Sequence, residues 1–299
     1  MPKPEAANIH KFISPYVVVS GKKFRLKDHH PGDTHHLNSE DKPEAKRLLE
    51  ESVRMLAELQ EVLYAQSSWG LLLIFQAMDA AGKDSTIKHV MSGVNPQGVD
   101  VFSFKSPSSE EVSHDFLWRT NRCLPPRGKI GIFNRSYYEE VLVVRVHPEL
   151  LEKQRIPDEL RGEHLWRHRF EDIDAFERYL TRNGIAIRKF FLNVSRKVQR
   201  QRFLERLEDP RKRWKFSGAD IRERKWWDSY QSAYEKMIRN TASEYAPWVV
   251  VPADNKWFTR LVVVATIVDA LASLDLKYPQ LNDRELKELA AARKQLEKE

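Results

Sequence analysis

An uninterrupted apolar run at residues 71–75 stands out from a chain that elsewhere mixes polar and apolar positions. Its length and its lack of alternation predict a strand that is buried on both faces, as in a parallel sheet. Small residues follow as far as Gly82 and Lys83, and residues 85–91 have the character of the first turns of a helix. A strand, a small-residue loop and a helix that meet at Gly-Lys form an arrangement that surrounds a phosphate with backbone N–H groups and a lysine.

The rest of the chain alternates in the same way and predicts an α/β fold. Leucines and valines recur at helical spacing from residue 43 to 66, which predicts an amphipathic helix that packs on the core. Four further strands are expected at residues 99–104, 129–133, 185–194 and 248–252. The helices expected between and after them lie at residues 108–122, 163–183, from about 195, 220–240 and 256–274.

The expected architecture is therefore a five-stranded parallel sheet flanked by helices. Residues 1–43 are expected to form an N-terminal arm wrapped on this domain, with a short edge strand near residues 16–20. The main domain is expected to span residues 44–282. Residues 283–299 predict a charged C-terminal helix, for which an exposed surface and an oligomer contact both remain open.

The composition favours an ordinary soluble protein. A chain of 299 residues can form one large α/β domain, and its single cysteine, Cys123, excludes internal disulfides and favours a reducing cytoplasm. No basic start followed by an apolar core opens the chain, and the longest apolar stretch, residues 261–271, is too short to span a bilayer. The expected location is therefore the cytoplasm.

A polar loop in the arm contains four histidines, His29, His30, His35 and His36. Histidines this close together can bind a transition metal, but a surface loop without a ligand has the same sequence character. Both interpretations stay open.

The formal net charge of +7 is concentrated in one window. Residues 196–225 contain twelve basic and five acidic side chains, so this window carries the whole excess and the rest of the chain is neutral. Such a surface attracts polyanions, either nucleic acid or a chain of phosphates. A solvated helix face, the alternative explanation, usually carries the two signs more evenly.

The loop after the first buried strand departs from the usual pattern G-x-x-x-x-G-K-[ST] at two positions. Ala77 occupies the place of the first glycine, and Asp84 replaces the hydroxyl that normally holds magnesium. A carboxylate, Asp79, lies inside the loop. The loop is interpreted as a variant phosphate loop; the alternative is a generic strand-to-helix turn in which Gly-Lys occurs by chance. The carboxyl end of the third strand, at Asn134, should face this loop because ligands bind at that edge of open parallel sheets.

Together these stretches resemble polyphosphate kinase family 2, whose members are polyphosphate:nucleotide phosphotransferases built like thymidylate kinases. The matching stretches lie in order within residues 45–275, at 78–84, 133–139, 201–206, 209–215 and 246–254. The resemblance implies a P-loop kinase fold with a basic helical lid at about residues 208–225. Asn134, where many members carry Asp, and Glu139 together resemble the class III branch, which phosphorylates both AMP and ADP.

The resemblance also implies roles for individual residues, because phosphoryl transfer depends mainly on positioning and on neutralising charge. Lys83 is expected to hold the transferred phosphate, and Asp79 to bind Mg²⁺ or orient the attacking oxygen. Arg135 presents a planar fork to phosphate oxygens, and Asn134 and Glu139 complete the metal and acceptor surroundings. Further phosphate or nucleotide contacts are expected from Ala80, Ala81, Gly82, Asp84, Ser85, Lys105 and Arg119, and lid or polyphosphate contacts from Arg202, Arg206, Lys212 and Lys215.

Two of these assignments have structural alternatives. Arg119 can instead pair with a glutamate on a helix face. Glu139 can instead pair with Arg135 or Arg145 and hold the loop in place.

The expected function is a reversible, Mg²⁺-dependent transfer of a terminal phosphate from inorganic polyphosphate to AMP or ADP. The expected partners are polyphosphate and the adenine nucleotides, without nucleic acid or membrane, and the chain is expected to form a homo-oligomer. One alternative is an ATP-dependent nucleoside or nucleotide kinase of the same fold. Another, from a different class, is a nucleic-acid-binding protein with a degenerate nucleotide site, which leaves Asp79, Lys83 and Arg135 unexplained.

Overall fold

The computed structural model describes residues 3–35, 37–38 and 40–299, without the side chains of residues 3–7 and 215. One sheet organises the chain, and its strands are β1 Val17–Val18, β2 Gly70–Gln76, β3 Val99–Ser103, β4 Ile130–Asn134, β5 Ile185–Asn193 and β6 Trp248–Pro252. The N-terminal half carries the helices α1 Lys3–Ile13, α2 Lys42–Gln66, α3 Lys83–Val90, α4 Ser109–Ser113, α5 Trp118–Asn121, α6 Val143–Val146 and α7 Glu149–Glu152. The remaining helices are α8 Leu165–Arg182, α9 Arg196–Glu208, α10 Gly218–Glu223, α11 Trp227–Thr241, α12 Lys256–Ala272 and α13 Asp283–Leu296.

The sheet is mixed and has six strands in the order β1-β6-β5-β2-β4-β3. The strands from β6 to β3 pair in parallel, whereas β1 pairs antiparallel with β6. The expectation of a five-stranded parallel sheet is therefore corrected: the suggested edge strand joins the sheet as its sixth member. Strand β2 is buried along its whole length, as its unbroken apolar run requires.

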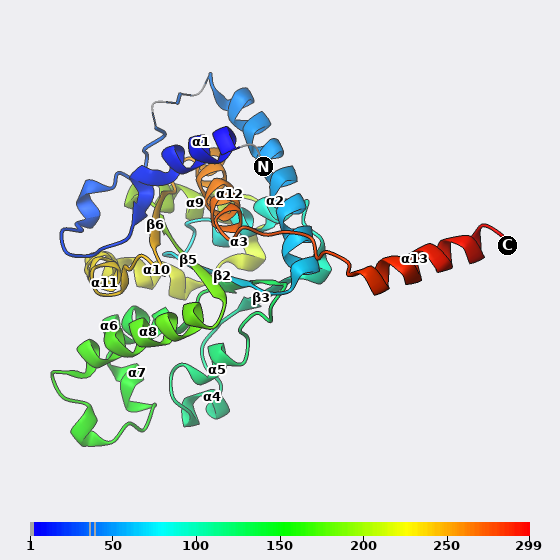
Figure 1. The fold of residues 1–299 in the computed structure, drawn as a ribbon. Helices are drawn as coiled ribbons and strands as arrows, with labels where there is room; N and C mark the ends of the chain where they lie inside the picture. The colour runs from blue at the N-terminus through cyan, green and yellow to red at the C-terminus, as the bar shows by residue number, and fades with distance from the viewer. Residues whose placement is uncertain (1–2, 36, 39) are drawn as a thin grey trace.

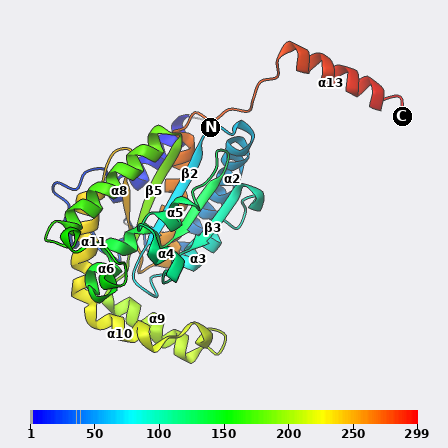
Figure 2. The ribbon, with the colours of Figure 1, turned by 90° about the horizontal axis from the view of Figure 1, so that it is seen from below.

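Helices cover both faces of the sheet (Figure 1). One face carries α2, α3 and α12, with α1 packed on α12, and the other carries α8 and α11. At one end of the molecule lie α9 and α10, far from α13, which projects away from the opposite end (Figure 2). None of the described helices combines the length and the apolar composition needed to cross a bilayer.

Two of the expected helices are each replaced by two separate ones. Residues 108–122 form α4 and α5, because Asp115 turns the chain between them: its carboxylate accepts from the Leu117 N–H at 2.9 Å and its carbonyl from the Trp118 N–H. Residues 220–240 are divided by a short 3₁₀ turn, Arg224–Trp226, into α10 and α11. The N-terminal arm also begins with α1, a helix that the sequence pattern did not indicate.

A buried polar cluster fixes the segment that follows β4. Lys189 of β5 donates to the Glu177 carboxylate at 2.5 Å, and both residues are fully buried. The hydroxyls of Tyr137 and Tyr138 donate to the same carboxylate at 2.9 and 2.7 Å. Because a buried charge pair is stable only when its remaining hydrogen bonds are satisfied, these two tyrosines complete the pair. Their backbone leads directly into Glu139, so the cluster fixes the approach to the site described next.

Candidate active site

A cavity of about 570 Å³ opens at the carboxyl edge of the sheet, beside the loop between β2 and α3. Most of the residues expected to form the site line it: Asp79, Ala80, Ala81, Gly82, Lys83, Asp84, Ser85, Lys105, Asn134, Arg135, Arg202, Arg206 and Lys212. The structure thus brings together the loop, the end of β4 and the basic window, which lie far apart in the sequence.

The loop between β2 and α3 has the backbone that a phosphate-binding turn requires. Gly82 caps α3 with φ of +106°, a left-handed conformation that strains any residue with a Cβ atom. Lys83 follows and is buried, with its Nζ donating to the Ala77 carbonyl at 2.7 Å. Burial lowers the pKa of the Lys83 ammonium, so a negative group at this point would stabilise its charged form.

Two polar pairs connect this loop to the end of β4. The Arg135 guanidinium donates to the Asp79 carboxylate at 3.0 Å, and the Asn134 amide donates to the Asp84 carboxylate at 2.9 Å. Arg135 adopts φ of +66°, and backbone strain of this kind is found at functional sites, where the surrounding structure holds it in place. The strain turns the Arg135 side chain back toward the loop instead of along the strand.

Arg202 of α9 is buried, and it fastens the loop to the end of β6. Its guanidinium donates to the carbonyls of Ala80 and Ala81 in the loop, at 3.2 and 2.7 Å, and to those of Ala253 and Asp254 after β6, at 2.7 and 3.1 Å. Because these partners are neutral carbonyls, none of them offsets the positive charge of the Arg202 guanidinium at the cavity. Burial lowers its pKa.

The other basic residues of the window lie nearer to solvent. Arg206 contacts Asp220 at 3.8 Å, and Lys212 contacts Asp209 at 2.9 Å. Lys212 pairs at the surface, where ion pairs contribute little to stability, so it can exchange its partner for a substrate anion. Lys215, the fourth expected member of this group, has its side chain outside the described part of the structure.

Glu139 lies in the short 3₁₀ helix Tyr137–Val141, which follows the end of β4. It does not line the cavity surface but is close enough to Lys83 and Arg135 for their charges to act on it. Burial raises the pKa of the Glu139 carboxyl, and these two cations oppose the increase. With the Gln76 amide turned to satisfy both its ends, its nitrogen donates to Glu139 Oε1 at 2.8 Å.

Among the described residues no ion pair within 4 Å joins Glu139 to Arg135 or Arg145: Arg135 pairs with Asp79, and Arg145 lies over the Trp166 ring. The charges of Glu139 and Arg135 nevertheless act on each other, so the alternative role of Glu139 in holding the loop stays open.

Arg119 lies away from the cavity surface. Its guanidinium donates to the Lys105 carbonyl at 2.8 Å, lies over the Phe104 ring and approaches Glu111 at 3.9 Å. This is close to the helix-face pairing considered as its alternative. Lys105 does line the cavity, so Arg119 supports the backbone of a lining residue.

Several residues at the cavity were not predicted from the sequence. Lys256, at the start of α12, lines it, and so does Asp220 of α10. Gln199 donates to the Asp79 carbonyl at 2.9 Å and thereby braces the loop. Lys256 could have been found, because it follows the last strand at the same edge of the sheet as the loop. Gln199 and Asp220 depend on how α9 and α10 fold over the loop, for which the sequence has no local signal.

The described residues contain no group of three or more His, Cys, Asp or Glu side chains that could hold a metal ion. Four carboxylates of the described residues do line the cavity, and two of them, Asp79 and Asp84, belong to the loop and the start of α3. In the histidine-rich loop, His30 accepts from the Gly32 N–H at 3.1 Å and His29 packs against Phe24. His36 lies outside the described residues.

These features define the class of the chain: an α/β protein in which a lysine-bearing loop between a strand and a helix forms a cationic cavity at the carboxyl edge of the sheet. Residues 38–279 match the model of the polyphosphate kinase 2 (PPK2) family, and the chain belongs to this family. The resemblance inferred from the sequence is thereby confirmed.

Characterised relatives and a solved structure agree with this assignment. The chain is similar to the ADP-polyphosphate phosphotransferase of Rhodopseudomonas palustris, at 52% identity over 86% of this chain and 89% of that protein. It is also similar to the AMP/ADP-polyphosphate phosphotransferase of Meiothermus ruber, at 44% identity over 89% of this chain and 95% of that protein. The crystal structure of polyphosphate kinase 2 from Arthrobacter aurescens TC1 superposes with a TM-score of 0.83 at 39% identity, covering 92% of this chain and 95% of that one.

Proposed function

We propose that the protein transfers the terminal phosphate of inorganic polyphosphate to AMP and ADP, reversibly and with Mg²⁺. The observation that carries this proposal is the convergence of Lys83, Arg135, Arg202, Arg206 and Lys212 on one cavity beside the loop. With Lys105 and Lys256, seven cations of the described residues line this cavity against four carboxylates, and this excess suits a chain of phosphates better than a single small phosphate. The names of the similar enzymes support the same donor and the same class of acceptor.

In this reaction an oxygen of the nucleotide's last phosphate attacks the terminal phosphorus of polyphosphate. A new P–O bond forms, the P–O bond to the next phosphate of the chain breaks, and the shortened polyphosphate leaves with the electron pair. Lys83 and the N–H groups at the start of α3 hold the transferred group, and Arg135 binds its oxygens in a forked contact. Arg202 keeps the loop in shape and adds its charge.

A magnesium ion fits the carboxylate oxygens that line the cavity. Mg²⁺ usually binds through one or two carboxylates together with substrate phosphates, and Asp79 and Asp84 are the carboxylates of the loop and the start of α3. When bound, the ion would neutralise charge on the reacting phosphates. Asp79 is the residue proposed to hold it, and Asn134 orients Asp84 through their hydrogen bond.

The choice between AMP and ADP is proposed to depend on Glu139, as in the class III branch. The two relatives differ in their named acceptors: one is named for ADP alone and the other for AMP and ADP. The anionic side chain cannot attract the AMP phosphate directly, so it would act through a bound cation or an ordered water.

Several broader features are proposed with this function. The fold is assigned to the P-loop kinase type, close to thymidylate kinases. Residues 1–43 serve as an arm, 44–282 as the catalytic domain with a lid at about 208–225, and 283–299 as a helix for homo-oligomer contact. A cytoplasmic location is the remaining proposal of this group.

The deciding experiment incubates the purified protein with Mg²⁺, long-chain polyphosphate and either AMP or ADP, and follows ADP and ATP by chromatography. Formation of ADP from AMP and of ATP from ADP supports the proposal. Transfer only from ATP would favour a nucleoside or nucleotide kinase. Tight binding to single-stranded DNA without any transfer would favour a nucleic-acid-binding protein.

Neutralising Lys212 and Lys215 together should weaken the use of polyphosphate more than that of nucleotide. Each of the two charges is expected to contribute roughly two- to fivefold to the KM for polyphosphate, with a steep dependence on salt. Steady-state kinetics at two ionic strengths measure this. Arg211→Ala is the matched control, because Arg211 contacts the same carboxylate, Asp209, but does not line the cavity. Equal losses for both substrates, or no effect of salt, would remove this segment from the polyphosphate path.

A further inference from the structure

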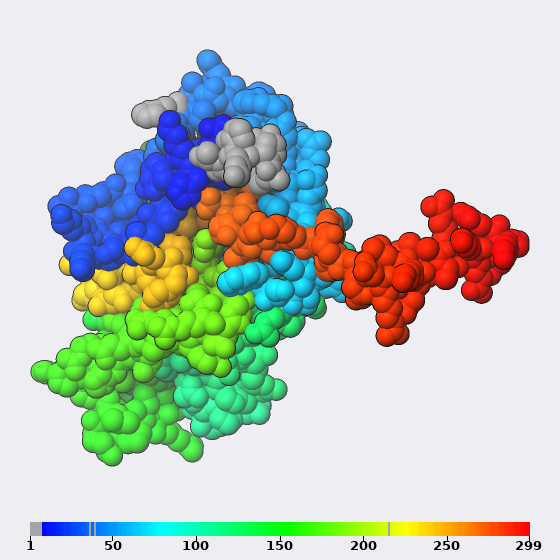
Figure 3. Space-filling model, viewed as in Figure 1, coloured from blue at the N-terminus to red at the C-terminus, as the bar shows by residue number. Residues whose placement is uncertain are grey.

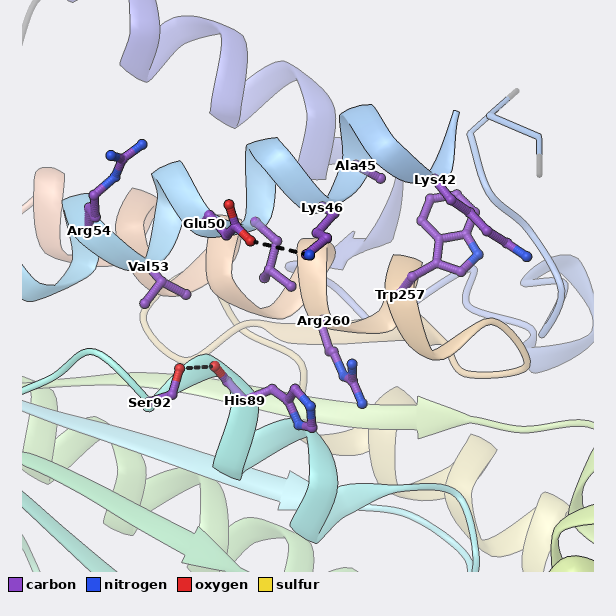
Figure 4. Close-up of a pocket in the computed structure, with 11 residues that line it drawn as sticks. Lys42, Ala45, Lys46, Glu50, Val53, Arg54, His89, Ser92, Trp257 and Arg260 are labelled. Atoms are coloured by element: carbon purple, nitrogen blue, oxygen red, sulfur yellow. Dashed lines mark hydrogen bonds and ion pairs between the residues drawn. The ribbon is translucent and has the colours of Figure 1, made fainter. Parts of the chain in front are cut away.

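A second cavity of about 770 Å³ lies between α2, α3 and α12, outside the site described above (Figure 4). Five of its lining residues have basic side chains: Lys42, Lys46 and Arg54 on α2, His89 on α3 and Arg260 on α12. Figure 4 shows Arg260 and His89 pointing toward each other between α12 and α3.

The positive charge of this cavity is poorly compensated. Among the described residues that line it, Glu50 is the only carboxylate, and it lies 3.8 Å from Lys46. The Arg260 side chain has no hydrogen bond or ion pair with any described residue, and its Nε atom is buried without a partner. Because an orphaned buried donor is costly, this guanidinium is prepared for an anion that comes from outside the chain.

Two helices, α3 and α12, each contribute residues to both cavities. On α12, Lys256 lines the active site, and Arg260, one turn later, lines the second cavity. On α3, Ser85 lines the first and His89 the second, and the His89 ring is hydrogen-bonded to the Ser85 carbonyl at 2.7 Å. The cations of the two cavities are therefore separated by about one helical turn on α12, from Lys256 to Arg260.

The electrostatics of Lys256 agree with this arrangement. Burial and the charges of Arg202, Lys212 and Arg260 lower the pKa of Lys256, and the Glu205 carboxylate opposes them. Arg202 and Lys212 belong to the active-site cavity, and Arg260 belongs to the second one. Lys256 thus lies within electrostatic reach of both.

The basic residues that α2 contributes to the second cavity are spread along the helix. From Lys42 to Arg54, helix α2 rises about 18 Å, at about 1.5 Å per residue. A single nucleotide phosphate would occupy only part of such a row, whereas an extended polyanion can contact all of it. The row therefore suits a chain of phosphates better than a nucleoside phosphate.

We infer that this second cavity binds the distal part of the polyphosphate chain while its terminal phosphate lies at Lys83. The inference rests on the proposed function and extends it to a preference for long chains. A long chain held at two linked sites gains affinity because its second contact is intramolecular, whereas tripolyphosphate is too short to occupy both.

The test compares long-chain polyphosphate with tripolyphosphate as donors, using the variants Arg260→Gln and Lys46→Ala. Arg260→Gln should raise the KM for the long chain by roughly tenfold, since it removes a contact between charged groups. The KM for tripolyphosphate and for ADP should not change. Arg47→Ala serves as the control, because Arg47 is the neighbour of Lys46 on α2 but pairs with Glu44 and Glu51 outside the cavity.

Lys46 is exposed, so Lys46→Ala keeps the test valid if Arg260→Gln destabilises the fold. Equal increases in KM for the two donors, or no increase for either, would overturn the inference. It would also be overturned if Arg260→Gln weakened ADP binding and left the KM for long-chain polyphosphate unchanged. A direct titration of long-chain polyphosphate into the Lys83→Met background separates this inference from the proposed function. Loss of affinity on adding Arg260→Gln supports the second cavity whether or not the wild type transfers phosphate, and unchanged affinity refutes it.

Discussion

Lys83→Met is expected to abolish phosphate transfer while leaving the fold intact. Lys83 lies buried at the start of α3. In the proposed reaction the transferred phosphate lies there, and its charge increases in the transition state. Removing such a group costs about 10²–10³ in rate. Steady-state turnover with polyphosphate and ADP measures the loss.

The stability of this variant tests the placement independently. Because burial lowers the pKa of Lys83, the folded state disfavours its charged form at neutral pH. Methionine has no charge to bury, so the melting temperature should stay the same or rise. Lys88→Met, an exposed change on the same helix, should keep both turnover and stability. An unfolded Lys83→Met protein, or one with nearly normal turnover, contradicts the role given to Lys83.

Glu139→Gln is expected to lose AMP phosphorylation by roughly 10–100-fold and to keep most ADP phosphorylation. AMP ends one phosphate earlier than ADP, so it needs a bridge to reach the transfer point, and a neutral amide holds a bridging cation less well. Glu139→Asn, which also replaces the carboxylate by a neutral amide, should act in the same direction. Parallel assays with AMP and ADP measure the ratio of the two rates.

The pH dependence of the wild type gives a second measurement at this position. Burial raises the pKa of Glu139, so on acidification its carboxylate becomes protonated at a higher pH than an ordinary glutamate does. AMP phosphorylation should therefore fall before ADP phosphorylation as the pH is lowered, and Glu139→Gln should remove this difference. Equal losses on both acceptors would instead assign Glu139 to holding the 3₁₀ helix, and an unchanged AMP rate would exclude it from acceptor choice.

Much of the fold follows from local sequence patterns. The parallel strands were found because each is a short stretch rich in apolar, β-branched or aromatic residues, and β6 was found with its bounds, Trp248–Pro252. The division of residues 108–122 into two helices was not found, because it depends on the turn made by Asp115. The sixth strand was suggested but not counted, since two residues paired at an edge leave almost no periodic signal.

The site was predictable where its residues are neighbours in sequence or lie at strand ends. Gly82 and Lys83 carry a recognisable pattern, and Arg135 follows directly on β4. The pairing of Arg135 with Asp79 needs a left-handed backbone that no sequence pattern indicates. Arg260 was missed for another reason: its importance arises only where α12 packs against α2 and α3, and such long-range packing has no local signal.

Helix α13 extends from the body of the molecule, and all its residues are exposed (Figure 3). It has a capping box at Asn282, and Leu286, Leu289 and Leu296 lie along one side of it. A single helix of 14 residues is only marginally stable in water, so a solitary α13 would unwind and rewind rapidly. Its backbone amides would then exchange with deuterium almost as fast as those of an unfolded peptide. If a second copy covers the leucines, the same amides become protected from exchange. The exchange rate of the α13 amides would therefore report whether the protein self-associates.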